Sequence, residues 1–301
     1  MDGPNRGPRS GIIAKDEPSI LWEDKNIAVL SKGPGWIVAV SRNLEQNRQH
    51  VYNLRKRAPD IKDLVQSGSF EHLCHYVALK FKENPEFQLC RSIEYEFGIA
   101  HRLDVDTSGA IMLGKTEHGF EHLRHGFQQH LVFKEYLALV HGAVQSDGEV
   151  DSPIAWDESS NISYISNQGN WAKTCYTVLS RYRLKGGKKH FTLVRVIIIT
   201  GRTHQIRIHM ASIGYPLVGD AKYNRKHGST DLMWCPRMFL HAWRLGFHDC
   251  SKTYHEVKAP LPRDLSKALR ALEEVKIDMD NLDNPSVRIV RPTTASKENV
   301  P

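Results

Sequence analysis

The apolar positions of this chain fall mostly in short runs with the length and composition of β-strands. Such runs, bounded by glycine, proline or polar residues, are typical of strands, whereas helices repeat apolar residues every three or four positions. Strands are predicted at 27–30, 36–40, 133–142, 171–183, 191–199, 237–247 and 254–259. The run 191–199 is almost continuously apolar, which predicts a central strand buried on both faces.

Helical spacing is confined to a few segments. Helices are predicted at 69–83, at 117–130, over a short stretch after residue 204 that ends at Gly214, and at 260–274. The stretch 143–170 is rich in Gly, Asp, Ser and Asn, and we expect it to be irregular. Strands therefore dominate the predicted fold.

The stretch 101–109 reads His-Arg-Leu-Asp-Val-Asp-Thr-Ser-Gly and lies between two apolar segments, 97–100 and 110–113. Asp, Thr, Ser and Gly suit a tight turn, so a strand, a polar turn and a second strand are predicted. A carboxylate held near a fixed arginine stays ionised and can act as a base, an electrostatic stabiliser or a nucleophile. A purely structural Asp-rich turn is the alternative interpretation.

Composition and charge narrow the class of protein. The chain has 301 residues, of which 40% are hydrophobic and 25% charged, and its net charge is +7 with a pI near 9.1. This charge favours a polyanionic partner such as RNA or DNA, although a basic protein that binds no nucleic acid is also consistent with it. We expect no membrane partner, because no run of about 18 apolar residues occurs.

Cysteine usage points to a reducing compartment. The five cysteines are odd in number and form no C-x-x-C pair, which argues against a disulfide framework and against a zinc knuckle. The first 20 residues lack the apolar core of a secretory signal. A cytoplasmic location is expected, with an organelle or the nucleus as alternatives.

The stretch 101–109 resembles the HRLD-x-x-TSG signature of the RluA class of RNA pseudouridine synthases. Four more segments resemble motifs of that class in the same order. A fifth, Lys-Gly-Pro-Gly at 32–35, resembles the first motif of the class, but its proline stands one place later than usual. The four are FKEYLALVHG at 133–142, AKTCY at 172–176, TGRTHQIRIH with GYPLVGDAKYN at 200–224, and RMFLHAWRLGF at 237–247. The resemblance covers about residues 20–270.

The resemblance implies an α+β fold, with a large, mostly antiparallel mixed sheet flanked by helices and loops. It implies isomerisation of uridine to pseudouridine in structured RNA, rRNA or tRNA, by base flipping and without a cofactor or metal. The catalytic residues would be Asp104, the carboxylate; Tyr136, which stacks on the uracil; and Arg207, which pairs with the carboxylate. Arg102 would help hold the RNA open, Leu240 would pack beneath the site, and Thr107 would contact substrate.

Two basic segments are candidate phosphate contacts. The hairpin 181–189 has a Gly-Gly turn and carries Lys185, Lys188 and Lys189, and the insertion 41–67 is polar and basic. Both could equally be solvated surface. We expect no S4-type module, which many members of the class carry, so RNA affinity would come from the catalytic domain, these segments or a partner.

The expected organisation is a disordered tail at 1–18, a catalytic domain at 19–275 and a loose tail at 276–301, in a monomer. Two other functions remain open at this point. One is a non-catalytic RNA-binding or RNA-folding protein on the same fold. The other is a metallo-hydrolase that uses His118, His122 and His125, which share one helix face. These histidines lack a Cys or carboxylate ligand at a recognised spacing, so no metal site is expected.

Overall fold

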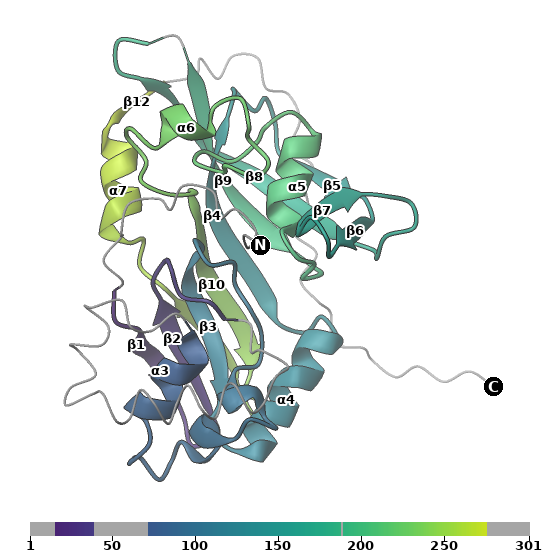
Figure 1. Cartoon of the computed structure of the whole chain (residues 1–301), viewed down its shortest axis with the longest axis vertical. Coiled ribbons are helices and arrows are strands. Elements are labelled where there is room, and N and C mark those ends of the chain that lie inside the picture. Colours follow the sequence, from purple (N-terminus) through teal and green to yellow (C-terminus); the bar gives the residue numbers. More distant parts are fainter. Residues whose placement is uncertain (1–15, 39–71, 188, 276–301) are drawn as a thin grey trace, which may run out of the picture.

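The computed structural model describes residues 16–38, 72–187 and 189–275 (Figure 1). Of the tail predicted at 1–18, residues 1–15 lie outside these residues, as do the predicted tail at 276–301, the insertion 41–67 and Lys188. The strands are β1 (Ser19–Glu23), β2 (Ile27–Lys32), β3 (Ser108–Gly114), β4 (Phe133–His141), β5 (Gly148–Asp151), β6 (Ile154–Asp157), β7 (Ile162–Ile165), β8 (Lys173–Leu184), β9 (His190–Ile198), β10 (Leu240–His248), β11 (Tyr254–Lys258) and β12 (Leu272–Glu274). The helices are α3 (Leu73–Lys80), α4 (Glu117–Gln128), α5 (Gln205–Ser212), α6 (Gly228–Asp231) and α7 (Arg263–Arg270), with 3-10 turns at Gln88–Arg91 and Glu96–Gly98.

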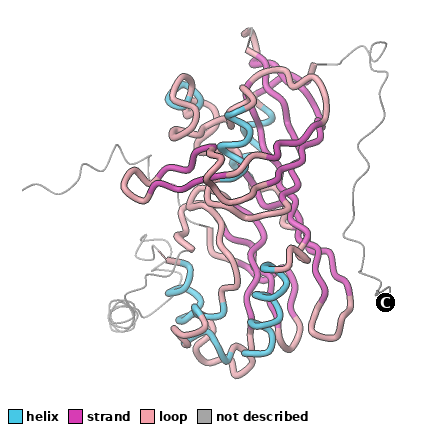
Figure 2. Tube along the Cα trace, turned by 90° about the vertical axis from the view of Figure 1, so that its right-hand side faces the viewer, coloured by secondary structure: helices cyan, strands magenta, loops and turns pink. Residues whose placement is uncertain are grey.

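One ten-stranded sheet organises the described residues. Its main order is β1-β2-β3-β10-β4-β9-β8-β12, with β11 on β10 and β5 on β8, and β6 and β7 form a separate hairpin. Only the β3–β10 pair is parallel among these described strands. The strands run along most of the long axis of the molecule in the side view of Figure 2. The α+β class and the mostly antiparallel mixed sheet are thus confirmed.

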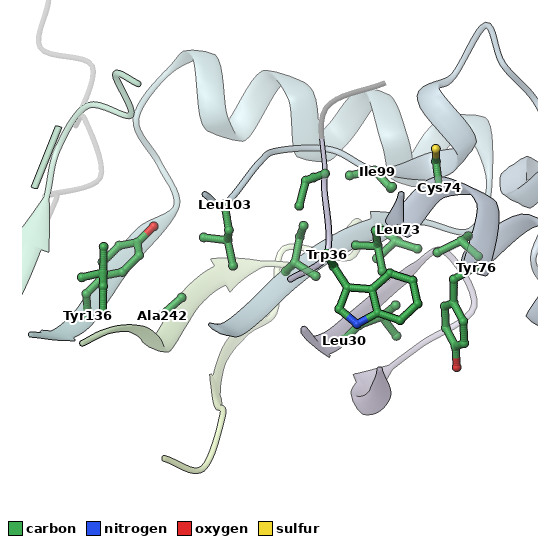
Figure 3. Close-up of a cluster of buried hydrophobic side chains, with 14 of the residues drawn as sticks. Leu30, Trp36, Leu73, Cys74, Tyr76, Ile99, Leu103, Tyr136 and Ala242 are labelled. Atoms are coloured by element: carbon green, nitrogen blue, oxygen red, sulfur yellow. The ribbon is translucent and has the colours of Figure 1, made fainter. Parts of the chain in front are cut away.

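The sheet separates two apolar clusters, because side chains alternate between its faces. On β2, Ala28 and Leu30 belong to the cluster that also contains Leu73 and Tyr76 of α3, part of which is drawn in Figure 3. The neighbouring Ile27 and Val29 belong to the cluster that contains Leu123 of α4. Each face of β2 is therefore buried under a different helix, and all four β2 side chains are at most 1% exposed.

Most predicted elements are present, but residues 36–38, the described part of the returning strand predicted at 36–40, do not form a strand. Within its described part, only an isolated bridge from Ile37 to His72 forms. Both edges of β2 are already occupied, by β1 and β3, so no returning strand can pair there. Gly35 instead adopts a φ of 81°, and its N–H bonds to Val105 at 2.8 Å. The chain is thereby directed toward the loop that contains Asp104.

Several other local predictions need correction. The strand expected before residue 101 is reduced to an isolated bridge from Ile99 to Leu113, because a 3-10 turn with Glu96 and Phe97 at positive φ precedes it. The stretch 143–170 contains β5, β6 and β7. Helix α7 is shorter than predicted and is followed by β12. Strand β9 is fully buried on one face only, since alternate residues from Leu193 to Ile197 are half-buried.

Candidate active site

A cleft of about 590 Å³ lies where loop 100–107, the end of α4, β4 and the β9–α5 connection meet. Figure 1 shows these elements around the middle of the molecule. The structure brings six of the residues predicted from sequence to its walls: Arg102, Asp104, Thr107, Tyr136, Arg207 and Leu240. They come from four different parts of the chain, and the fold alone brings them together.

The Lys-Gly-Pro-Gly segment at 32–35 supports the loop that carries Asp104. Asp104 starts a tight turn, in which the Thr107 N–H bonds to the Asp104 carbonyl at 3.1 Å. The Val105 carbonyl accepts both the Gly35 N–H at 2.8 Å and the Lys32 ammonium at 3.1 Å. The displaced proline therefore leaves the segment able to support the loop.

Arg237 holds the other side of the turn. Its guanidinium is buried and donates to the Asp106 carbonyl and to the Ser108 hydroxyl, each at 2.9 Å, while Asp264 holds its Nε at 2.6 Å. These contacts leave the Asp106 side chain exposed and outside the cleft, whereas Asp104 lines it. The two carboxylates of the turn therefore have different surroundings.

Only glycine fits at residue 109, the last position of the motif, because a Cβ there would collide with β10. Its φ is 123°, and an added Cβ would lie 2.2 Å from the carbonyl oxygen of Ala242. This close approach is the start of the parallel pairing of β3 with β10. A glycine here lets the turn pack directly against β10, the strand that also supplies Leu240.

Arg207 holds the Asp104 carboxylate. Its Nη1 donates to Asp104 Oδ2 at 3.0 Å, while its Nε and Nη2 form a fork with the two oxygens of Asp220 at 2.7 and 2.8 Å. The Asp220 side chain is fully buried. Burial lowers the pKa of Arg207, but the two carboxylates outweigh it and raise the pKa above its usual value. Arg207 is a permanent cation beside Asp104.

Tyr223 and His204 support the guanidinium from one side. The Arg207 Cζ lies 5.1 Å from the centre of the Tyr223 ring, and the Tyr223 hydroxyl is 2.9 Å from His204 Nδ1. Burial lowers the pKa of His204 to about 4, an effect that Asp104 opposes and Arg207 reinforces. His204 is therefore neutral near pH 7 and adds no charge to the site.

Tyr136 of β4 forms part of the cleft wall and is 8% exposed. Burial and the negative charge of Asp104 raise the pKa of its hydroxyl. The hydroxyl forms no hydrogen bond with the described residues. The ring therefore offers an apolar surface to whatever enters the cleft, with a hydroxyl that stays protonated.

The family model for RNA pseudouridylate synthase matches residues 77–212. An RNA pseudouridine synthase of Aquifex aeolicus described as uncharacterized is 33% identical over 241 residues, which cover 78% of this chain and 66% of that protein. The chain belongs to the RNA pseudouridylate synthase family. An uncharacterized RNA pseudouridine synthase of Bacillus subtilis, YlyB, is 39% identical over 180 residues, and ribosomal large subunit pseudouridine synthase D of Nitrosomonas europaea is 37% identical over 185. Each match covers 59% of this chain, and the chain spans 56% and 52% of those two proteins.

Two solved structures share the fold of this family member. Human RNA pseudouridylate synthase domain containing 1 has a TM-score of 0.61 at 23% identity, covering 87% of this chain and 90% of its own. Human RNA pseudouridylate synthase domain containing 4 has a TM-score of 0.58 at 22% identity, covering 84% and 93%. Both therefore share the fold over more than four fifths of this chain.

The described lysines of the predicted basic hairpin are not among the residues that line the cleft. The β8–β9 turn is present, with Gly186 at a φ of 70°, but neither Lys185 nor Lys189 lines the cleft. Lys189 instead lines a second, smaller hollow of about 460 Å³ with Arg225 and Lys226. Both predicted lysines are exposed.

The histidines of α4 were the candidate ligands of the metallo-hydrolase alternative. In the described part of the chain, no three His, Cys, Asp or Glu side chains are placed to hold a metal ion. His122 Nε2 instead lies 2.8 Å from the His248 carbonyl. His209, in the TGRTHQIRIH motif, is buried between the Thr174 hydroxyl at 2.8 Å and the Ser152 carbonyl at 3.0 Å.

None of the described helices combines the length and apolar character that crossing a bilayer requires.

Sequence reasoning did not assign a role to Asp220 or Arg237. Both lie inside segments that the motif comparison quoted, so a signal existed, but their partners are distant in sequence. Asp220 meets Arg207 across 13 positions, and Arg237 meets the turn around Asp106 across more than 100. Such contacts become visible only in the fold.

Proposed function

We propose that this cleft converts uridine to pseudouridine in RNA, with Asp104 as the reacting carboxylate. The observation that carries the proposal is that Asp104 is the only carboxylate among the described residues lining the cleft, and that Arg207 holds it. The reaction breaks the bond from ribose to N1 of uracil and forms a bond from the same carbon to C5. C5 loses a proton and N1 gains one, so the atoms balance. It is an isomerisation and needs no redox partner. Residues 19–275 form the proposed catalytic unit.

The charge pattern suits an ionised carboxylate in contact with substrate. Arg207 stabilises the charged form of Asp104 by attraction and by a hydrogen bond to Oδ2. Oδ1 forms no hydrogen bond with the described residues, so it is the oxygen available to attack or stabilise the sugar or the base. A positioned carboxylate of this kind is a known means of covalent catalysis.

The apolar part of the cleft suits a detached base. Tyr136 provides a ring face on which a uracil can stack, and Leu240 packs next to it on the paired strand. Thr107 is 1% exposed and its hydroxyl has no partner in the described structure. An unpaired buried hydroxyl costs about 1–3 kcal/mol, which a polar group of the uridine would offset.

The uridine must leave its stack to reach this cleft, because its reacting atoms are covered in a helix. Arg102 is exposed at the cleft wall and is the candidate to fill the space that the flipped nucleotide leaves. Two relatives are named ribosomal large subunit pseudouridine synthase D and C. Ribosomal RNA is therefore the first substrate to test, and tRNA is the second.

A comparison of pseudouridine maps tests the proposal. RNA from cells with and without the protein is mapped for pseudouridine, and the purified protein is then added to RNA from the cells that lack it. We expect at least one site to disappear without the protein and to return on addition of the wild type. A purified protein that binds the RNA but restores no site would favour the non-catalytic RNA-binding alternative.

A further inference from the structure

Lys134 is a buried cation at the floor of the cleft. It lies on β4, is 6% exposed and lines the cleft. Its ammonium donates one hydrogen bond, to the Ile199 carbonyl at 3.1 Å. No carboxylate of the described residues lies within 4.0 Å of it. A buried charge without a counter-ion is costly, so its presence needs an explanation.

Lys115 shows how this chain treats a buried lysine that has only a structural role. Lys115 is 1% exposed, and its ammonium contacts Glu23 and Glu86, each at 2.8 Å, as well as the Asp24 carbonyl at 2.7 Å. Its charge is compensated within the protein. The difference between the two lysines is the missing anion at Lys134.

The strand geometry explains why no internal carboxylate reaches Lys134. Side chains alternate along β4, so Glu135 points to the opposite face, where it pairs with Arg244 at 2.6 Å. Lys134 and Tyr136 share the cleft face and are separated by about 7 Å along the strand. That spacing is close to the size of one nucleotide, so a base on Tyr136 would bring its own or the next phosphate near Lys134.

The neighbours of Lys134 are also cationic or neutral. Arg202 is exposed at the same cleft, donates through Nε to the Trp171 carbonyl at 3.0 Å and forms no ion pair with the described residues. Burial and Arg202 lower the pKa of Lys134 to about 8. His130, at a strained φ of 56°, is kept neutral because burial and Lys134 lower its pKa. These described neighbours therefore do not repel an anion.

We propose that Lys134 and Arg202 form a subsite for a backbone phosphate of the RNA, at or next to the nucleotide whose base stacks on Tyr136. The inference rests on the proposed function, because that function supplies the anion. Lys134 is in this view a positioning residue: it fixes the nucleotide relative to Asp104 and takes no part in bond making. Its role differs from that of the exposed hairpin lysines, which lie outside the cleft.

A role for Lys134 as the base that removes the C5 proton is the competing interpretation. Arginine separates the two, since it carries a fixed charge that binds phosphate but does not accept a proton near pH 7. Methionine is a second useful replacement, because it keeps an unbranched apolar chain and removes the charge. The subsite therefore predicts that Lys134→Arg is largely active and that Lys134→Met is not.

The decisive experiment measures RNA binding in an Asp104→Asn background, so that turnover is not needed. The probe is a short oligouridylate, compared with the same oligomer carrying neutral methylphosphonate linkages. Lys134→Met should weaken binding of the charged oligomer roughly 10-fold or more and lower its salt slope by roughly 0.7. Lys134→Arg should restore most of the binding. Both variants should bind the neutral oligomer as the parent does, and Lys258→Met, on exposed β11, is the control for the removal of one positive charge.

Stability gives an independent readout. Without RNA, Lys134→Met should raise the melting temperature by roughly 3 °C or more, because it removes an uncompensated buried charge, whereas Lys115→Met should lower it. A purely structural role for Lys134 predicts a loss of stability instead and would overturn the proposal. Two other results would also overturn the proposal. One is unchanged binding of the charged oligomer by Lys134→Met. The other is a reduced kcat with a normal KM in Lys134→Arg. If the wild type forms no pseudouridine but the binding results hold, the proposed function fails and the phosphate subsite stands.

Discussion

Arg207 donates one N–H to Asp104 and two to Asp220. The two bonds to Asp220 form a planar fork, and Asp220 Oδ1 also accepts the backbone N–H groups of Lys222 and Tyr223 at 3.0 and 3.1 Å. The guanidinium is therefore fixed before Asp104 is considered, and the N–H groups of its Nη1 have set directions, one of them toward Asp104 Oδ2. The position of the Asp104 carboxylate thus depends on a second carboxylate, Asp220, which is fully buried and does not line the cleft.

Removal of the Asp220 charge should damage both stability and activity. Asp220→Asn leaves Arg207 buried without its main counter-ion, and we expect the free energy of unfolding to fall by about 3 kcal/mol. Activity should fall more than the unfolded fraction explains, because Arg207 can then turn toward Asp104. Urea unfolding and turnover of the same preparations measure the two effects. Asp249→Asn is the control: Asp249 is 8% exposed and pairs with His255 away from the cleft, so its loss should cost stability without specific loss of turnover.

Asp104 and Asp106 form a matched pair within one turn. Asp104→Asn should abolish pseudouridine formation, because an amide has no charge to offer the sugar or the base, and RNA binding and thermal stability should change little. Asp106→Asn should retain near-normal turnover, since its side chain is exposed and outside the cleft. Turnover by purified variants on the mapped RNA checks both, and near-normal turnover of Asp104→Asn would refute the assignment.

Six residues named from the motif resemblance line the same cleft, and the motif around Asp104 also has local requirements of its own. The turn from Asp104 to Gly109 needs residues that bond their own backbone and a glycine at positive φ. Both requirements can be recognised from the local sequence. What the sequence could not show is the distance between motifs. Arg237 and Lys32 support the Asp104 loop from elements far along the chain, and only the sheet order places them there.

The wrong strand prediction at 36–40 has a related cause. Its composition is typical of a strand, but a strand needs a free edge to pair with, and both neighbours of β2 are already taken. The opposite error occurred at 143–170, where β5 and β8 pair although polar residues dominate the stretch. Local propensity is a weak guide wherever tertiary pairing decides.

Two substitutions of Tyr136 separate its ring from its hydroxyl. Tyr136→Phe keeps the stacking surface, so we expect turnover within several-fold of the wild type. Tyr136→Leu loses the flat face and should lose roughly 10-fold or more, in line with about 1–3 kcal/mol per stacked base. Steady-state kinetics on the mapped RNA tests this. Equal losses in both variants would instead assign a proton-transfer role to the hydroxyl.

The partly buried His101 should make the protein less stable in mild acid. Burial, with help from Lys134, lowers its pKa to about 3, whereas an unfolded histidine titrates near its ordinary value of 6.5. The unfolded state therefore binds more protons below pH 6.5, and the free energy of unfolding falls as pH is lowered from there toward 3. The share from His101 is about 2 kcal/mol between roughly pH 7 and pH 5.

The replacement His101→Gln isolates that share. The wild-type Nε2 accepts the Met112 N–H at 3.0 Å, and a glutamine oxygen can do the same without titrating. Urea unfolding at several pH values should show a shallower loss of stability for His101→Gln than for the wild type. Parallel pH curves for the two proteins would mean that His101 is not kept neutral by burial.

The basic hairpin should contribute affinity for RNA without affecting the chemistry. Lys185 and Lys189 are exposed and form no ion pair with the described residues, so their charges are free to meet phosphates outside the cleft. Replacement of Lys185, Lys188 and Lys189 by glutamine should weaken RNA binding. The slope of log affinity against log salt should also fall by roughly one unit for each phosphate that the hairpin no longer neutralises. Turnover of bound RNA should stay unchanged, because Asp104, Tyr136 and Arg207 are untouched.

The matched control replaces Lys25, Lys82 and Lys258, which line neither hollow and should leave the slope nearly as it is. An unchanged slope for the hairpin variant would show that these lysines only keep the turn solvated, and phosphate binding would then fall to the cleft walls.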